Sequence, residues 1–106
     1  MCYSIVITTT DDELIAEKLA NILIKKNLAA CVQIEKIKSY YMWENNITNS
    51  DEYKLTIKIK SNLYSNVEKE ILLNHNYNLP QIIELKIDGG YSSYLEWIKN
   101  SYDRIC

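Results

Sequence analysis

The feature that most constrains this chain is a long stretch with no turn-forming residue, LAACVQIEKIKSYYMW at 28–43. Read as a β-strand, residues 29–43 would extend roughly 50 Å, at about 3.3 Å per residue. A compact domain of this size has a diameter nearer about 35 Å. The hairpin must therefore either coil strongly within a monomer or project beyond its own core. We expect projection and an oligomer, because the aromatic segment SYYMW would otherwise be an aggregation-prone edge.

The rest of the chain alternates between strand and helix periods, in the order strand, helix, strand, strand, helix, strand, helix. The expected strands are residues 3–9, 28–43, 53–60 and 83–87. This order predicts an α+β protein of the ferredoxin-like type, a two-layer sandwich in which an antiparallel sheet with a long central hairpin packs under two helices. The third helix follows at the C-terminus, and we expect one domain over residues 1–106.

Two details of the central hairpin can be predicted. Its apolar residues change face between Ile34 and Ile37, and such a change of parity predicts a β-bulge near Glu35-Lys36. Asn45-Asn46 can supply the positive φ angles of a tight turn.

The helix boundaries carry recognisable signals. Thr10–Glu13 has the form of a capping box, and the helix that follows should end near Lys26-Asn27. A second helix should begin around 62–65 and end near His75. Ser93-x-x-Glu96 predicts the cap of the last helix.

Composition excludes several function classes. The formal net charge of −2 argues against a partner held by phosphate attraction, so we expect no nucleic-acid binding. No apolar run reaches the roughly 20 residues of a membrane helix, and no basic leader precedes an apolar segment, so we expect no membrane partner. The cysteines Cys2, Cys31 and Cys106 form no CxxC pair, which favours free thiols in a reducing, cytoplasmic environment.

Five motifs are found along the chain in a fixed order. They are LAACV at 28–32, S-x-Y-x-W at 39–43, Glu52 with Lys58 six residues later, H-x-Y-x-x-P at 75–80, and Y-L-x-W at 94–97. With this order and spacing the chain resembles the divalent-cation tolerance (CutA) family over nearly its whole length. The resemblance implies a homotrimer whose long hairpins pack between subunits. It also implies a non-enzymatic role in the tolerance of divalent cations, copper in particular.

The resemblance further implies a binding cleft between subunits. The residues at the matching positions are Ser39, Tyr41, Trp43, Glu52, Lys58, His75, Tyr77, Pro80, Tyr94 and Trp97. No cofactor would be required, although copper or another divalent cation could bind, with His75 as its ligand. A small ligand or a partner protein could also occupy the cleft.

The chain departs from the family pattern at four positions. Asn45 replaces the usual glycine of the hairpin turn, Asn76 replaces a proline, and Gln81 replaces a glutamate, so that one negative charge is lost. Thr8 stands where some members have a cysteine implicated in copper binding. A threonine hydroxyl is a poor copper ligand, so this departure bears on metal binding and not on the fold.

The role of His75 stays open among three alternatives: a helix-terminal histidine bonded to a neighbour, a residue that lines a pocket, and a metal ligand. Glu52 and Lys58 share a strand face but lie about 20 Å apart, so each needs a cross-strand or cross-subunit partner. In a cleft of aromatic residues, Lys58 would attract an anion. An alternative function is therefore a signalling trimer that senses a small anion and binds no metal directly.

Two other function classes fit the same fold less well. An acylphosphatase-like enzyme needs an arginine cradle near the first loop, and TTTDDE at 8–13 offers none. An RNA-binding module needs aromatic and basic motifs on its central strands, which are absent from a chain of negative charge.

Overall fold

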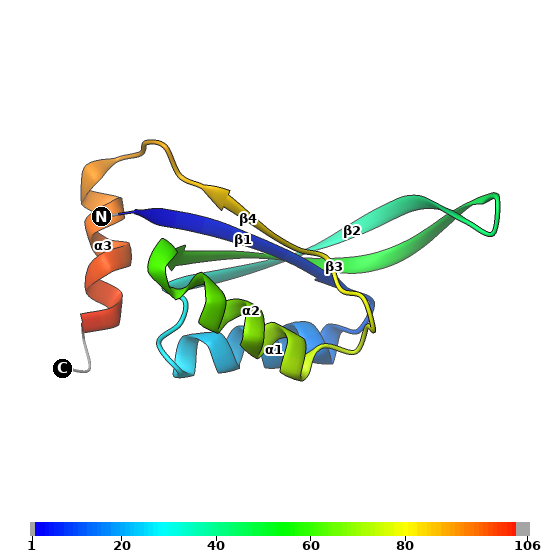
Figure 1. The fold of residues 1–106 in the computed structure, drawn as a ribbon, viewed down its shortest axis with the longest axis horizontal. Helices are drawn as coiled ribbons and strands as arrows, with labels where there is room; N and C mark the ends of the chain where they lie inside the picture. Colours follow the sequence, from blue (N-terminus) through cyan, green and yellow to red (C-terminus); the bar gives the residue numbers. More distant parts are fainter. Residues whose placement is uncertain (1, 104–106) are drawn as a thin grey trace.

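The computed structural model describes residues 2–103, and it confirms the predicted order of strands and helices (Figure 1). Four strands form one antiparallel sheet in the order β2-β3-β1-β4. A short 3₁₀ helix, η1, precedes the second α-helix. The elements are β1 (Tyr3–Thr10), α1 (Glu13–Lys25), β2 (Cys31–Trp43), β3 (Asn46–Lys60), η1 (Ser61–Leu63), α2 (Tyr64–Asn74), β4 (Ile82–Lys86) and α3 (Ser92–Asp103).

Helices α1 and α2 cover one face of the sheet and enclose the main core (Figure 1). Apolar residues recur on one side of each helix and at every second position of the central strands, so both layers bury an apolar face. The fully buried members are Val6, Ala16, Leu19, Leu23, Leu55, Ile57, Ile59, Val67 and Ile71.

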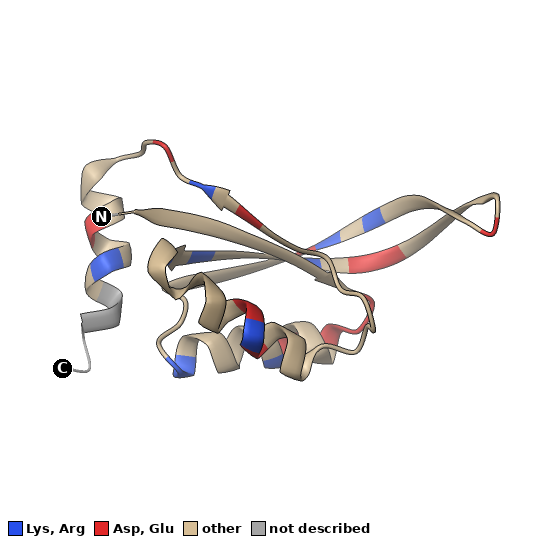
Figure 2. Cartoon of the chain, viewed as in Figure 1, with Lys and Arg blue, Asp and Glu red and all other residues tan. Residues whose placement is uncertain are grey.

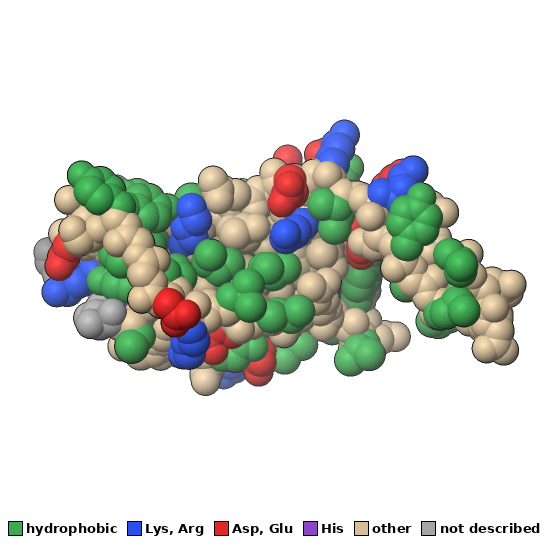
Figure 3. Space-filling model, turned by 90° about the horizontal axis from the view of Figure 1, so that it is seen from above, with side chains coloured by type: hydrophobic (Ala, Val, Ile, Leu, Met, Phe, Trp, Pro, Cys, Tyr) green, Lys and Arg blue, Asp and Glu red, His purple; other side chains and the backbone are tan. Residues whose placement is uncertain are grey.

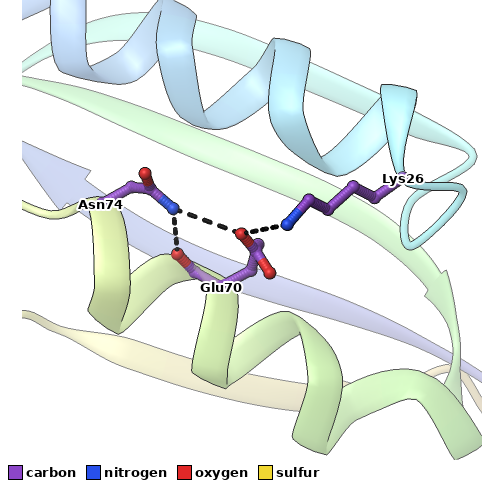
Figure 4. Close-up of polar contacts among 3 residues, drawn as sticks. All are labelled: Lys26, Glu70 and Asn74. Carbon is purple, nitrogen blue, oxygen red and sulfur yellow. Dashed lines mark hydrogen bonds and ion pairs between the residues drawn. The ribbon is translucent and has the colours of Figure 1, made fainter.

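A polar contact ties the two helices together at their surface (Figure 4). Lys26 Nζ lies 2.9 Å from Glu70 Oε1, and the side-chain amide of Asn74 donates to the Glu70 backbone carbonyl at 2.8 Å. Because Lys26 is largely exposed, this ion pair adds little to the free energy of folding.

The β2–β3 hairpin projects well beyond the core, so that the molecule measures 49 × 26 × 21 Å (Figure 1). The ladder runs without interruption from Cys31 opposite Lys58 to Trp43 opposite Asn46. The predicted bulge is therefore wrong. Strand β1 ends opposite Tyr53, so beyond that residue β3 pairs with β2 alone. We call this part of the hairpin, residues 37–52, the arm.

The change of parity has a different cause. Near the core, Val32 and Ile34 lie on the same side as Ile57 and Leu55, toward the helices. The arm has no helix beneath it, so its apolar residues need not stay on that side. From Ile37 onward they occur on both faces without any shift of register.

Three local predictions need correction. The turn residues with positive φ are Glu44 and Asn45, at 50° and 65°, one position earlier than expected.

The cap of α1 is Asp12, whose carboxylate accepts from the backbone N–H of Leu14 at 2.9 Å, and not a Thr10 capping box. Helix α3 begins at Ser92, so Ser93 lies within the helix instead of capping it. The ends of α1 and α2 are as predicted.

The sheet face opposite α1 and α2, called here the open face, is covered only in part. Ile98 of α3 packs against Tyr3 at one end. Farther along, Ile83 and Leu85 of β4 stay 44% and 49% exposed. Figure 3 looks onto this face and shows hydrophobic side chains gathered over the middle of the sheet and on the arm.

The structure also describes two of the three cysteines and all three α-helices. Cys2 and Cys31 are free thiols, whereas Cys106 lies outside the described residues. No helix within residues 2–103 has the length and apolar character needed to span a bilayer.

Candidate functional site

A cavity of about 780 Å³ lies on the open face and extends along the arm, from Glu52 at its base to Trp43 near its tip. One wall comes from β2 and β3 of the arm, and the other from the end of β1 and from the loop that joins α2 to β4. The described lining residues are Thr9, Asp11, Tyr41, Trp43, Ser50, Glu52, Tyr77, Asn78, Leu79 and Gln81. Its size is in the usual range for a small-molecule site.

The carboxylate of Glu52 is the most buried charged group of this cavity, with only 9% of the residue exposed. Ser39 Oγ donates to its Oε1 at 2.6 Å, and Tyr77 Oη donates to its Oε2 at 2.7 Å. Short O–H···O⁻ bonds of this kind are charge-assisted and stronger than neutral hydrogen bonds. They fix the orientation of the carboxylate and offset the cost of its burial.

The environment of Tyr77 keeps its hydroxyl protonated. Burial raises the pKa of Tyr77 well above its usual value, and the hydrogen bond to Glu52 and the nearby charge of Asp11 raise this pKa further. Ionisation would place a phenolate against two carboxylates. Tyr77 is therefore a lasting hydrogen-bond donor to Glu52.

Both ring nitrogens of His75 are bonded within the chain. Nε2 lies 2.8 Å from the carbonyl oxygen of Thr9, and Nδ1 accepts the backbone N–H of Tyr77 at 3.0 Å. A carbonyl only accepts and an amide N–H only donates, so these partners assign the neutral tautomer with its proton on Nε2. His75 thus connects the end of β1 to the loop that carries Tyr77.

A second set of bonds holds the same loop against β1. Thr10 Oγ1 donates to Asn76 Oδ1 at 2.6 Å, and Asn76 Nδ2 donates to Asp11 Oδ1 at 2.8 Å. Asn76 stands where the family pattern has a proline, so the two polar bonds here take the place of a conformational restraint. The loop is consequently fastened to the end of β1 at two successive residues, His75 and Asn76.

A second cluster lies on the open face, toward the far end of β3. Lys58 Nζ donates to Tyr94 Oη at 2.9 Å and lies 5.1 Å from the centre of the Tyr94 ring. The rings of Tyr94 and Trp97 are stacked at 5.7 Å. The hydrogen bond to Tyr94 raises the pKa of Lys58 despite the opposing effect of burial, which keeps the ammonium charged.

The structure thus divides the predicted site residues into two groups within one chain. Ser39, Tyr41, Trp43, Glu52 and Tyr77 meet at the cavity, with His75 and Pro80 in the loop beside it. Lys58, Tyr94 and Trp97 form the separate cluster.

Several lining residues were not anticipated from the sequence. They are Thr9, Asp11, Ser50, Asn78, Leu79 and Gln81. One signal could have indicated two of them, because Thr9 and Asp11 stand where β1 ends, and the helix-to-strand loop must pass that end of the sheet. The sequence indicates only a lost charge at Gln81, whereas in the structure its side-chain oxygen accepts the Thr9 hydroxyl at 3.4 Å.

The described residues of one chain do not fit a copper site. No three His, Cys, Asp or Glu side chains within residues 2–103 gather closely enough to hold a metal ion. A metal at His75 would have to displace the bond to Thr9 or the bond to Tyr77. The Thr8 hydroxyl is buried without a hydrogen-bond partner, and it offers no soft ligand.

Comparison with known proteins identifies the family. Residues 4–101 match the family described as CutA1 divalent ion tolerance protein. "Protein CutA, chloroplastic" of Arabidopsis thaliana is 39% identical over 98 residues, which are 92% of this chain and 54% of that protein. "Divalent-cation tolerance protein CutA" of Archaeoglobus fulgidus is 35% identical over 88 residues, 83% of this chain and 86% of that protein. The chain spans about half the length of this Arabidopsis protein and of "Protein CutA 1, chloroplastic" of Oryza sativa subsp. japonica.

Solved structures agree with the sequence match. The crystal structure of CutA1 from Oryza sativa has a TM-score of 0.90 at 36% identity, over 95% of this chain and 94% of that one. A structure described as the periplasmic divalent cation tolerance protein CutA from Archaeoglobus fulgidus has a TM-score of 0.89 at 32% identity, over 94% of this chain and 98% of that one. The family match covers most of the described residues, and the folds coincide over the same range. The chain belongs to the CutA1 divalent ion tolerance protein family.

Proposed function

We propose that this chain acts in divalent-cation tolerance, as the names of its relatives say of them. In this proposal it works as a homotrimer of the ferredoxin-like type, without enzyme activity, and its binding cleft lies between subunits. Copper is the cation to which the response would be directed.

The observation that carries the proposal is the division of the site along β3. Glu52 and Lys58 both face the open side of the sheet, six residues or about 20 Å apart. One chain cannot close this distance, whereas the cluster of one subunit could complete the cavity of another. A cleft between subunits would then use all ten predicted residues.

Exposed apolar surface supports an assembly. Trp43 is 64% exposed, and the neighbouring arm residues Tyr40, Met42 and Ile47 are at least as exposed. A monomer in water would leave these side chains unpartnered together with the exposed β4 residues of the open face. Burying both surfaces against other copies would remove an aggregation hazard.

The mass in solution tests the assembly. Light scattering should give three times the 12.4 kDa chain mass. Leu85→Glu places a charge on the open face and should lower that mass. Leu73→Glu, at a comparably exposed position on α2, should leave it unchanged. A wild-type monomer at micromolar concentration would reject the trimer.

A second candidate function is a trimer that senses a small anion and binds no metal directly. Two observations favour it: the charged Lys58 beside two stacked aromatic rings, and the full use of both His75 nitrogens by the chain itself. The ligand would be a carboxylate or a phosphate, and its signal would pass to a partner protein.

Calorimetric titration with Cu²⁺, Cu⁺ and Zn²⁺ separates the two candidates. Sub-micromolar binding that is lost in His75→Gln would establish direct metal handling. Cys31→Ser serves as the control for binding by a free thiol. A trimer without tight metal binding, but with phosphate or carboxylate binding lost in Lys58→Ala, would establish the second candidate.

The remaining aspects of the proposal follow from composition. We place the protein in the cytoplasm, because Cys2 and Cys31 are free thiols of the kind that a reducing environment preserves. We propose neither a nucleic-acid nor a membrane partner, in keeping with the net charge of −2. The partner at the cleft would be a small ligand or a protein.

A further inference from the structure

The carboxylate of Glu52 and the ammonium of Lys58 are each held by neutral groups of their own chain. The hydrogen bonds to Glu52 come from the hydroxyls of Ser39 and Tyr77. Lys58 donates to the hydroxyl of Tyr94. None of the ion pairs among the described residues involves Glu52 or Lys58. Each charge is therefore oriented within one chain without being neutralised there.

Both groups retain hydrogen-bonding capacity after these internal bonds are made. An ionised carboxylate offers about four acceptor positions, and an ammonium group offers several N–H donors. The two hydroxyls occupy one position on each oxygen of Glu52, and Tyr94 takes one N–H of Lys58. A ligand would meet groups that are already oriented and that lose little entropy on binding.

The two charges lie on the same face of β3, six residues or about 20 Å apart. Figure 2 shows acidic residues where β3 enters the arm and basic residues farther along the strand. The described lining of the cavity includes the carboxylates of Asp11 and Glu52 and no Lys, Arg or His. A cleft in which Lys58 of one subunit completes the cavity of another would bring charges of both signs together.

Such a cleft would select a ligand by its charges. An anionic ligand that pairs with Lys58 would also lie beside the carboxylate of Glu52, and a cationic ligand that pairs with Glu52 would lie beside the ammonium of Lys58. Each arrangement leaves a repulsion between like charges. A zwitterion avoids both repulsions. In an α-amino acid the two charged groups are attached to one carbon atom, so a small molecule can pair with both residues at once.

Apolar surface lies beside both charges. The rings of Tyr94 and Trp97 are stacked next to Lys58, and each of these residues is 38% exposed. Tyr41 and Leu79 contribute to the lining of the cavity that contains Glu52. The volume of about 780 Å³ is enough for a small molecule. An apolar side chain on the ligand would therefore be buried against these groups.

We infer that the cleft between subunits binds a zwitterionic α-amino acid with an apolar side chain. Glu52 of one subunit accepts from the ammonium of the ligand, and Lys58 of the next subunit donates to its carboxylate. Tyr94 and Trp97 pack against its side chain. The inference rests on the proposed function for the cleft itself, to which it adds the chemical class of the ligand.

Four ligands test the charges that the cleft selects. Free phenylalanine carries both charges and a ring, phenethylamine lacks the carboxylate, hydrocinnamate lacks the ammonium, and glycine lacks the ring. Isothermal titration at neutral pH should show phenylalanine binding at least about tenfold tighter than each of the other three. Equal affinity for phenylalanine and either singly charged ligand, or no binding of phenylalanine, would overturn the inference.

Variants assign each charge of the ligand to a residue. Glu52→Gln should weaken phenylalanine binding by about tenfold but should not weaken hydrocinnamate binding, because hydrocinnamate has no ammonium group. Lys58→Gln should likewise weaken phenylalanine binding without weakening phenethylamine binding. The matched controls are Glu17→Gln and Lys18→Gln, at exposed positions of α1 on the other side of the sheet, and neither should change the affinity for phenylalanine.

Mixed trimers test whether the two charges come from different subunits. The Glu52→Gln and Lys58→Gln chains are unfolded together and refolded as an equal mixture. A Lys58→Gln chain supplies an intact Glu52, and a neighbouring Glu52→Gln chain supplies an intact Lys58. About a quarter of the clefts should therefore recover phenylalanine binding, whereas neither variant recovers it when refolded alone. No recovery in trimers of confirmed mixed composition would contradict a shared site.

Light scattering on the same samples separates failure of this inference from failure of the proposed function. A trimer that does not prefer phenylalanine retains the proposed assembly and overturns the amino-acid site. A monomer overturns the shared cleft and, with it, both proposals.

Discussion

Tyr77 donates its phenolic hydroxyl to Glu52 across 2.7 Å, joining the loop after α2 to the base of the arm. The two residues are far apart in sequence and come from elements that share no backbone ladder. The same carboxylate also accepts the hydroxyl of Ser39. One buried charge therefore fixes the relative position of three segments around the cavity.

Removing the Tyr77 hydroxyl should weaken the fold measurably. Tyr77→Phe leaves one oxygen of a buried carboxylate without its donor, which costs about 1–3 kcal/mol of the free energy of unfolding. Urea unfolding followed by circular dichroism measures the change. Tyr40→Phe, on an exposed ring of the arm, should change stability by less than about 0.5 kcal/mol.

Combining Tyr77→Phe with Ser39→Ala tests whether the two donors act on one group. Both side chains bond the same carboxylate, so their effects should not be additive, with a coupling of about 0.5 kcal/mol or more. Simple additivity would show that the two bonds stabilise the cavity independently.

The tautomer of His75 can be read directly, because it is the only histidine of the chain. The bonds to Thr9 and Tyr77 require a proton on Nε2 and a bare Nδ1. Long-range ¹H–¹⁵N correlation at neutral pH should therefore show this single tautomer. A spectrum of the Nδ1–H form, or of a rapid mixture, would contradict the assigned role of His75.

Tyr64 should make stability depend on pH in alkaline solution. Its hydrogen bond to Glu68, together with burial, raises the pKa of Tyr64 to about 12. The folded state thus favours the protonated phenol. This contribution is complete below the unfolded pKa of about 10 and is lost as the pH rises toward 12.

Urea unfolding on both sides of pH 10 should therefore show a smaller alkaline loss of stability in Tyr64→Phe than in the wild type. Ultraviolet titration of tyrosinate should place Tyr77 and Tyr64 among the last tyrosines to ionise. An unchanged pH dependence in Tyr64→Phe would exclude the bond to Glu68 as its source.

The hairpin turn contains a residue in an unfavourable conformation. Glu44 has a φ of 50°, in the left-handed region that glycine adopts at no steric cost. Glu44→Gly should raise the free energy of unfolding by about 0.5–1 kcal/mol. Glu44→Ala removes the same charge without relieving the backbone and should give no such gain, so equal effects of the two variants would attribute the change to charge.

The architecture could be predicted because it depends on local periodicity. Val67 and Ile71 recur at helical spacing, and Leu55, Ile57 and Ile59 alternate, so these residues indicate both their elements and their buried faces. The prediction of a bulge was wrong because it assumed that α1 and α2 cover the hairpin along its whole length. On the arm, which these helices do not cover, the alternation of apolar residues no longer indicates which face is buried.

The candidate site was predictable only in its outline. The family motifs named Glu52, Tyr77 and Trp43, which the structure brings to one cavity. They could not indicate that the backbone of Thr9 holds His75, because a carbonyl group carries no side-chain signature. The strand spacing did place Lys58 about 20 Å from Glu52, but it could not indicate that Tyr77 bonds Glu52 and Tyr94 bonds Lys58.

The ladders of this sheet differ greatly in the sequence distance they bridge. The arm joins residues that are near one another along the chain, whereas the pairing of β1 with β4 joins residues 4–8 to residues 82–86. Local contacts form fastest because little loop entropy must be lost. During synthesis, β2 and β3 are complete before β4 has been made. We therefore expect the β2–β3 hairpin to pair on the nascent chain before β4 completes the sheet. The surface proposed to join subunits would then form before the rest of the domain has folded.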